Sequence, residues 1–191
     1  MKMTAIEKRF VNSTSHALTV AERAKQLLSR IPLQSGWRYL DVGCGVGAAA
    51  RDIAIRNPLS VTGIDVDPKQ IELARGGTAN LNLQFRVMDA TRLEFGDGEF
   101  DIVASHMATH HIPDWERAFS EMVRVLRPGG YLIYRDFMFP SWLARIGRRL
   151  LRFMGFPSIG KLHSLAPAAG LVELYESKES GKVDSIWVKN G

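Results

Sequence analysis

The chain has 191 residues, a length that fits one domain with a three-layer α/β core. Its composition is that of an ordinary globular protein, and its formal net charge is +5. A single cysteine excludes an intrachain disulfide, and no stretch approaches the ~20 apolar residues of a transmembrane helix. No signal peptide opens the chain, so we expect a cytoplasmic protein.

The excess of positive charge is confined to one segment. No acidic residue lies between Asp136 and Glu173, whereas five cations fall in that interval: Arg145, Arg148, Arg149, Arg152 and Lys161. The basic residues elsewhere equal the 20 acidic residues in number. This pattern does not indicate a nucleic-acid-binding face spread over the protein.

Hydrophobic periodicity and chain breakers predict alternating helices and strands in the first half of the chain. After a lead-in over residues 1–18, of which 3–12 form a loose segment or a short helix over the site mouth, the predicted elements are a helix over 19–31, a strand over 37–42, a helix over 48–56, a strand over 61–65, a helix over 68–75 and a strand over 83–88. Asp67 followed by Pro68 predicts a capped start for the third of these helices.

The second half continues the alternation and ends in two strands. The predicted elements are a strand over 100–105, a helix over 115–126 that stops at Arg127-Pro128-Gly129-Gly130, a strand over 131–136, and strands over 171–176 and 183–188. A short turn at Gly181 makes the last two an antiparallel hairpin at a sheet edge. We expect residues 1–191 to form one domain, with 137–165 as a lid on the substrate side.

Three alternating glycines follow the first predicted strand. Gly43, Gly45 and Gly47 allow a sharp bend and a close approach of a ligand, and the amides at the following helix start would face that ligand. Spacing alone fits a dinucleotide site as well. Asp41, two places ahead of the first glycine, favours a cationic ligand over a pyrophosphate. Cys44 is interpreted as a small residue that fits the turn.

Six motifs occur in order at domain spacing: Asp41-Val-Gly-Cys-Gly-Val-Gly47, Gly63-Ile-Asp65, Met88-Asp-Ala90, Phe100-Asp-Ile-Val103, His110-His-Ile-Pro-Asp114 and Val125-Leu-Arg-Pro-Gly-Gly130. In this order the chain resembles the small-molecule branch of the class I S-adenosylmethionine-dependent methyltransferases, which includes quinone and lipid-headgroup enzymes. The resemblance implies a Rossmann-like three-layer sandwich with a seven-stranded, mostly parallel sheet and an antiparallel C-terminal hairpin strand. It also implies S-adenosylmethionine as cofactor, S-adenosylhomocysteine as product, and a small-molecule or lipid-like acceptor.

The same resemblance assigns cofactor contacts to residues after the strands. Asp41 and the glycine backbone would hold the methionine part, Asp65 the ribose hydroxyls and Asp89 the adenine amine, although Asp89 could instead cap a turn. The predicted cofactor-binding residues are Asp41, Gly43, Cys44, Gly45, Gly47, Asp65, Val66, Asp89, Ala90, Ser105 and His106.

Methyl transfer from a sulfonium is an in-line displacement that depends on alignment in a dry pocket. A general base is needed only if the acceptor keeps its proton. The candidates for this role are His106, His110 and Asp136, with His163 as a residue that folds over the methyl group. His111 is expected to pack or cap a turn. A metal is not expected, because beyond the fourth strand only Asp114 and Asp136 could serve as ligands of a catechol-type site.

Residues 141–156 form a predicted basic amphipathic helix, with Trp142 and Ile146 on its apolar side and four arginines on another. It is either a lid that packs on the acceptor pocket, with Trp142 and Phe139 as walls, or a peripheral membrane contact.

Other functions stay open at this point: an inactive S-adenosylmethionine-binding sensor domain, a nicotinamide oxidoreductase and a nucleic-acid methyltransferase. No Asn/Asp-Pro-Pro-aromatic tetrapeptide follows the fourth strand, so we expect no nucleic-acid substrate. The sequence does not determine the oligomeric state.

Overall fold

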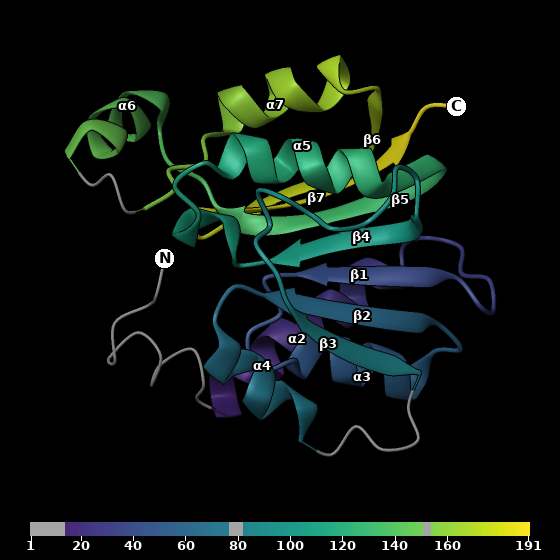
Figure 1. Ribbon diagram of the computed structural model, residues 1–191. Helices are drawn as coiled ribbons and strands as arrows, with labels where there is room; N and C mark the ends of the chain where they lie inside the picture. Colours follow the sequence, from purple (N-terminus) through teal and green to yellow (C-terminus); the bar gives the residue numbers. More distant parts are fainter. Residues whose placement is uncertain (1–13, 77–81, 151–153) are drawn as a thin grey trace.

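The computed structural model describes residues 14–76, 82–150 and 154–191 (Figure 1). Its strands form one sheet in the order β3-β2-β1-β4-β5-β7-β6. All neighbouring pairs are parallel except the two that involve β7, which runs antiparallel to both β5 and β6. The strands are β1 Arg38–Val42, β2 Ser60–Asp65, β3 Leu83–Val87, β4 Phe100–His106, β5 Leu126–Phe137, β6 Leu171–Glu179 and β7 Lys182–Lys189. The expected Rossmann-like sheet with an inserted antiparallel strand is confirmed.

Helices cover both faces of the sheet (Figure 1). One face carries α2 (Thr14–Leu28), α3 (Ala48–Arg56) and α4 (Pro68–Arg75); the other carries α5 (Trp115–Val125) and α7 (Ile159–Ala168). The short helix η1 (Thr109–His111) and α6 (Ser141–Leu150) lie toward the carboxyl ends of the parallel strands. Each face has its own buried apolar cluster, so the chain forms a three-layer α/β/α sandwich.

Local chemistry explains the starts of α3 and α4. The Asp67 carboxylate accepts the Lys69 N–H at 3.0 Å, with Pro68 in the first turn, as the sequence predicts. Helix α3 has no side-chain cap, and instead begins after Gly47 at a φ of +77°. A glycine at this position enters the helix from the left-handed region without strain.

The largest errors in the predicted boundaries are the starts of one helix and one strand, and smaller ones are the ends of α2, at Leu28 rather than 31, and of β6, at Glu179 rather than 176. Helix α2 begins at Thr14, so the last residues of the expected lead-in are helical, whereas the predicted segment over 3–12 lies outside the described residues. Strand β5 begins at Leu126 rather than at Tyr131. Leu126 pairs with Phe100, and a register shift between Phe100 and Ile102 accommodates the proline and glycines that we expected to break the chain.

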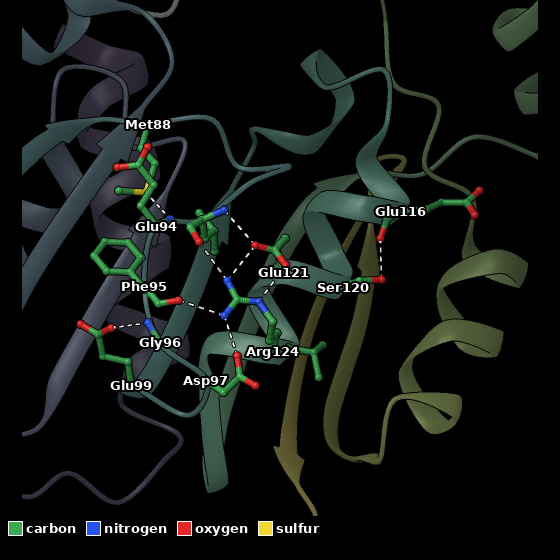
Figure 2. A network of polar contacts seen from close by, with 12 residues as sticks. Met88, Glu94, Phe95, Gly96, Asp97, Glu99, Glu116, Ser120, Glu121 and Arg124 are labelled. Atoms are coloured by element: carbon green, nitrogen blue, oxygen red, sulfur yellow. Dashed lines mark hydrogen bonds and ion pairs between the residues drawn. The ribbon is translucent and has the colours of Figure 1, made fainter.

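Arg124 of α5 fixes the long loop between β3 and β4 (Figure 2). Its guanidinium donates to the carbonyl oxygens of Leu93 and Phe95 at 2.9 Å, to Asp97 at 2.7 Å and to both oxygens of Glu121 at 2.8 Å. Glu121 in turn accepts the Leu93 N–H at 2.8 Å. This planar set of donors ties the loop to α5. Among the described residues, no helix combines the length and the apolar character needed to cross a bilayer.

Candidate active site

A cavity of about 850 Å³ lies at the carboxyl ends of β1, β2 and β4. Most of the predicted site residues line it: Asp41, Gly43, Cys44, Gly45, Asp65, Val66, Asp89, Ala90, His106 and His110. Gly47, Ser105 and Asp136 are not among its lining residues. Sheet topology explains the grouping, because the ends of adjacent parallel strands meet at one edge.

The three loop glycines differ in what surrounds them: Gly43 and Gly47 pack against other residues, whereas Gly45 faces open space. A Cβ on Gly43 would lie 2.3 Å from the Cβ of Ala108, and one on Gly47 would lie 2.4 Å from the Phe85 ring. These two glycines therefore allow the loop to pack against the protein. Gly45 has a φ of +53° and no atom within 4 Å of the place where a Cβ would stand, and it lines the cavity. Gly45 is thus the position at which a ligand could approach the backbone.

The amides of Gly43, Cys44 and Gly45, in the loop whose glycine backbone we expect to hold the methionine part, donate to groups of the protein itself. The N–H groups of Gly43 and Cys44 both donate to the Ile64 carbonyl at 2.9 Å, and that of Gly45 donates to Asp65 Oδ2 at 3.0 Å. A phosphate-binding loop presents such amides to the anion. This arrangement therefore argues against a dinucleotide site.

Asp41 is a buried carboxylate beside the loop. It is 1% exposed, and its Oδ2 has no hydrogen-bond partner among the described residues. Burial, followed by the negative charge of Asp65, raises its pKa from 3.8 to about 7, while the Ala50 N–H partly offsets this. Burial also raises the pKa of Asp65. Two carboxylates that resist ionisation make this end of the cavity favourable for a cation and unfavourable for a phosphate.

The side chains of Asp65 and Asp89, which line the same end of the cavity as Asp41, already hold local turns. Asp65 accepts the Asp67 N–H at 2.9 Å through Oδ1, in addition to the Gly45 contact through Oδ2. Asp89 Oδ1 accepts the N–H and the hydroxyl of Thr91, both at 2.8 Å. Each carboxylate oxygen has a second lone pair, so capping does not prevent either side chain from accepting ligand hydroxyl or amine protons.

Neither the Cys44 thiol nor the His106 imidazole is suited to nucleophilic or acid–base chemistry near neutral pH. Burial, with the charges of Asp41 and Asp65, raises the pKa of the Cys44 thiol well above its usual value, so the thiol is a packing group. Burial and the nearby Arg135 lower the pKa of His106 to about 4. His106 Nε2 lies 3.3 Å from the Tyr39 hydroxyl. A neutral, weakly basic imidazole is poorly suited to take a proton at neutral pH.

His110 and Asp136 form a buried pair at the other end of the cavity. His110 Nδ1 lies 2.5 Å from Asp136 Oδ1, which also accepts the Phe137 N–H at 2.7 Å. Asp136 Oδ2 accepts the N–H of Thr109 at 2.6 Å, the hydroxyl of Thr109 at 2.5 Å and the N–H of His110 at 3.2 Å. Because Nδ1 donates to the carboxylate, the Nε2 atom of neutral His110 carries the lone pair.

Sequence reasoning missed several residues of this end. Thr109 is fully buried and takes a hydrogen bond of 2.5 Å with the Tyr134 hydroxyl. Phe137 packs edge-on against the His110 ring at 5.3 Å between centroids, and Lys182 Nζ lies 4.9 Å from the centre of the Phe137 ring. Phe137 and Lys182 both line the cavity. Lys182 could have been found only from the strand pairing, because it is the register partner of Phe137 on the antiparallel strand β7.

His163, expected to fold over the methyl group, and the two expected pocket walls, Phe139 and Trp142, do not line the cavity. His163 is on α7, where its Nε2 lies 2.5 Å from Glu176 Oε2 of β6. With Glu173 these two residues form a group within 4.8 Å, in which Glu176 is half-buried, outside the cavity lining. The Phe139 ring packs edge-on against the Phe156 ring, with 5.1 Å between centroids, and neither Phe139 nor Trp142 lines the cavity.

A family model described as "Methyltransferase domain" matches residues 40–134, which include the glycine loop and His110 but not Asp136, Phe137 or Lys182. The chain belongs to the class I S-adenosylmethionine-dependent methyltransferases. This identification confirms the resemblance seen in the sequence, and S-adenosylmethionine is the cofactor of the family.

The sequence of this chain is similar to parts of two curated methyltransferases. This chain is 38% identical over 117 residues to 27-O-demethylrifamycin SV methyltransferase of Amycolatopsis mediterranei. The alignment covers 59% of this chain and 43% of the relative. The chain is 35% identical over 153 residues to 2-methyl-6-phytyl-1,4-hydroquinone methyltransferase of a Synechocystis strain, with 74% and 48% covered. The chain thus spans less than half the length of these relatives.

Among solved structures, the fold matches a phosphoethanolamine N-methyltransferase of Haemonchus contortus in complex with phosphomonomethylethanolamine and S-adenosylhomocysteine. The TM-score is 0.76 at 18% identity, covering 96% of this chain and 59% of that chain. This likeness supports the Rossmann-like methyltransferase fold.

Proposed function

We propose that the chain transfers the methyl group of S-adenosylmethionine to a hydroxyl or an activated carbon of a small, lipid-like acceptor. One observation carries the proposal: a single cavity joins a carboxylate-lined glycine loop to the His110–Asp136 pair. The first suits a cofactor with a cationic amino-acid tail, and the second suits removal of an acceptor proton. The names of the two curated relatives, which methylate a rifamycin and a phytyl-hydroquinone, are consistent with an acceptor of this type.

The cofactor end fits S-adenosylmethionine by charge and by space. The buried Asp41 would hold the ammonium, which relieves the carboxylate whose Oδ2 has no partner among the described residues. Asp65 would accept the ribose hydroxyls and Asp89 the adenine amine. Gly45 would leave room for the backbone to approach the methionine part.

When bound, the cofactor supplies a methyl group on a sulfonium, with a neutral thioether as leaving group. The residues of the chain then have two tasks. The first is alignment of the acceptor with that methyl group in the water-poor space formed by Ala108, Ile112 and Phe137. The second is removal of the acceptor's proton: His110 Nε2 takes the hydroxyl proton as the new bond to the methyl carbon forms, and Asp136 stabilises the resulting imidazolium through Nδ1.

A comparison of histidine variants tests the assignment of His110. Wild type, His110→Gln and the control His163→Gln, whose histidine is exposed and paired with Glu176, are assayed with labelled S-adenosylmethionine on a panel of phenolic and hydroquinone lipids. We expect His110→Gln to lose about 10²–10⁴ in turnover with unchanged cofactor affinity by calorimetry, and the control to match the wild type. Unchanged turnover of His110→Gln would remove it from the mechanism, and affinity for NAD in place of S-adenosylmethionine would overturn the function.

A further inference from the structure

Helix α6 is attached to the protein by its smallest residues. Ala144 is fully buried, and a Cβ on Gly147 would lie 2.5 Å from the Phe156 ring. The Phe156 ring packs in turn on Phe139. A close approach through Ala144 and Gly147 directs this side of the helix inward and leaves the opposite side to the exterior.

The outward side of α6 carries large apolar residues. Trp142 is 65% exposed and Ile146 is 47% exposed. They are four residues apart, so they lie one above the other on one face of the helix, and the exposed Arg145 is beside them. This result is the reverse of a lid that packs its apolar residues on the acceptor pocket, since neither Trp142 nor Ile146 lines the cavity.

The charge of the chain segment that contains this face favours one kind of partner. No acidic residue occurs between Asp136 and Glu173, while the same interval contains four arginines and Lys161. Two copies of this segment, which contains no acidic residue, would bring like charges together across a twofold interface. An anionic surface complements it, and a tryptophan beside arginines on a short helix is suited to the headgroup region of a bilayer.

The helix is also linked to the acceptor end of the cavity. The segment after it returns to the His110 turn, where the Gly155 N–H donates to the His110 carbonyl at 3.0 Å. A Cβ on Gly155 would lie 2.4 Å from the carbonyl oxygens of Thr109 and Ile112, so this contact is a direct backbone packing. Figure 1 places α6 beyond the carboxyl ends of the strands, the edge at which the cavity lies.

From these observations we propose that the α6 face of Trp142, Arg145 and Ile146 binds the surface of an anionic lipid bilayer. The contact brings the acceptor end of the cavity to the membrane surface, where a lipid-like acceptor is dissolved. The second statement rests on the proposed function; the first does not.

Vesicle co-sedimentation of the full chain tests the contact. The probes are vesicles of phosphatidylcholine alone and of phosphatidylcholine mixed with phosphatidylglycerol, each at low and at high salt. We expect binding to the anionic vesicles, weakened by salt, a loss of about tenfold or more in partitioning for the double variant Trp142→Ser/Ile146→Ser and a loss of about fivefold for Arg145→Glu. The controls Leu73→Ser, with an exposed leucine on α4, and Lys69→Glu on the same helix are expected to bind like the wild type.

Tryptophan fluorescence adds a readout specific to one residue. Brominated lipid in anionic vesicles is expected to quench the emission, and the quenching is expected to disappear in Trp142→Phe. Absence of binding to anionic vesicles, or equal binding by Trp142→Ser/Ile146→Ser, would overturn the proposal. So would light scattering that shows a dimer lost in the same double variant without vesicle binding.

A turnover assay separates this inference from the proposed function. With an acceptor dissolved in detergent, Trp142→Ser/Ile146→Ser is expected to retain wild-type turnover while losing the stimulation by anionic vesicles. No vesicle binding with normal detergent turnover refutes the membrane contact alone. Vesicle binding without turnover on any acceptor refutes the enzyme function alone.

Discussion

The burial of Asp41 leads to a prediction that separates stability from binding. In the folded protein its pKa is raised from 3.8 to about 7, chiefly by burial. Because the folded pKa lies above the unfolded one, the folded state holds the proton more tightly and ionisation opposes folding. The unfavourable contribution is absent below about pH 4, grows through the window from about pH 4 to 7 and is constant above it.

The size of the effect follows from the shift. Each pKa unit corresponds to 1.36 kcal/mol, so a shift of about three units opposes folding by about 4 kcal/mol above pH 7 and by about 1.5 kcal/mol at pH 5. Asp41→Asn preserves the shape and an acceptor for the Ala50 N–H but removes the charge. We therefore expect this variant to be more stable than the wild type, and increasingly so as the pH rises.

Urea denaturation without ligand, from about pH 5 to about pH 8, measures the difference in unfolding free energy. The control is Asp52→Asn, a surface carboxylate paired with Arg56 at 2.7 Å, for which no pH-dependent gain is expected. Calorimetry is expected to show the reverse order for binding, with S-adenosylmethionine held more weakly by Asp41→Asn at pH 8. A difference in stability that stays constant with pH, or an Asp41→Asn variant less stable than the wild type at pH 8, would refute the reasoning.

Three further predictions concern single contacts. Gly47→Ala is expected to unfold more easily than Gly45→Ala by about 2 kcal/mol in urea, because its Cβ meets the Phe85 ring, whereas Gly45→Ala is expected to weaken S-adenosylmethionine binding in calorimetry. Arg124→Met is expected to lose about 2–3 kcal/mol of stability by the same assay, because two loop carbonyls and Glu121 lose their donor; a loss below the error of the measurement would contradict the role of the network. Because His106 has a pKa lowered from 6.5 to about 4, the folded state disfavours its protonation, and stability is lost as the pH falls through that window. His106→Asn is therefore expected to gain about 3 kcal/mol relative to the wild type between pH 7 and pH 4, which parallel urea titrations would measure.

That Asp41 and Asp65 lie together with the glycine loop could be predicted from sequence, because these residues lie at the ends of adjacent strands. Asp41 and Asp65 each lie at or near the carboxyl end of a strand, and periodicity places those strands within a residue or two. Asp67 as a helix cap followed from the same local reasoning. The hydrogen bonds of the loop amides could not be predicted in this way. Gly45 and Asp65 are 20 residues apart, and the bond between them depends on how β1 and β2 pair.

The acceptor end and α6 depend on packing that local patterns do not encode. His110 and Asp136 were both candidates, but their pairing arises from the neighbouring ends of β4 and β5. For α6, periodicity identifies an apolar side yet does not say which side faces the protein. The close fit of Phe156 against Gly147 decides it, so the small residues are buried and Trp142 is exposed.

The buried carboxylates at the two ends of the cavity differ in how many hydrogen bonds they accept. This difference matches the roles proposed for them, in which Asp136 orients His110 and Asp41 binds a cation. Asp136 accepts hydrogen bonds from Thr109, His110 and Phe137, so it holds the imidazole in place whether or not a ligand is present. Asp41 keeps one oxygen without a partner among the described residues, and the Ala50 N–H offsets its charge only in part, so a cationic ligand would compensate the remainder. Ligand binding then stabilises the fold through Asp41, and by linkage the stabilisation by S-adenosylmethionine should be larger at pH 8 than at pH 5. The instability that the carboxylate imposes is what makes the site discriminate a cationic cofactor from a phosphate-bearing one.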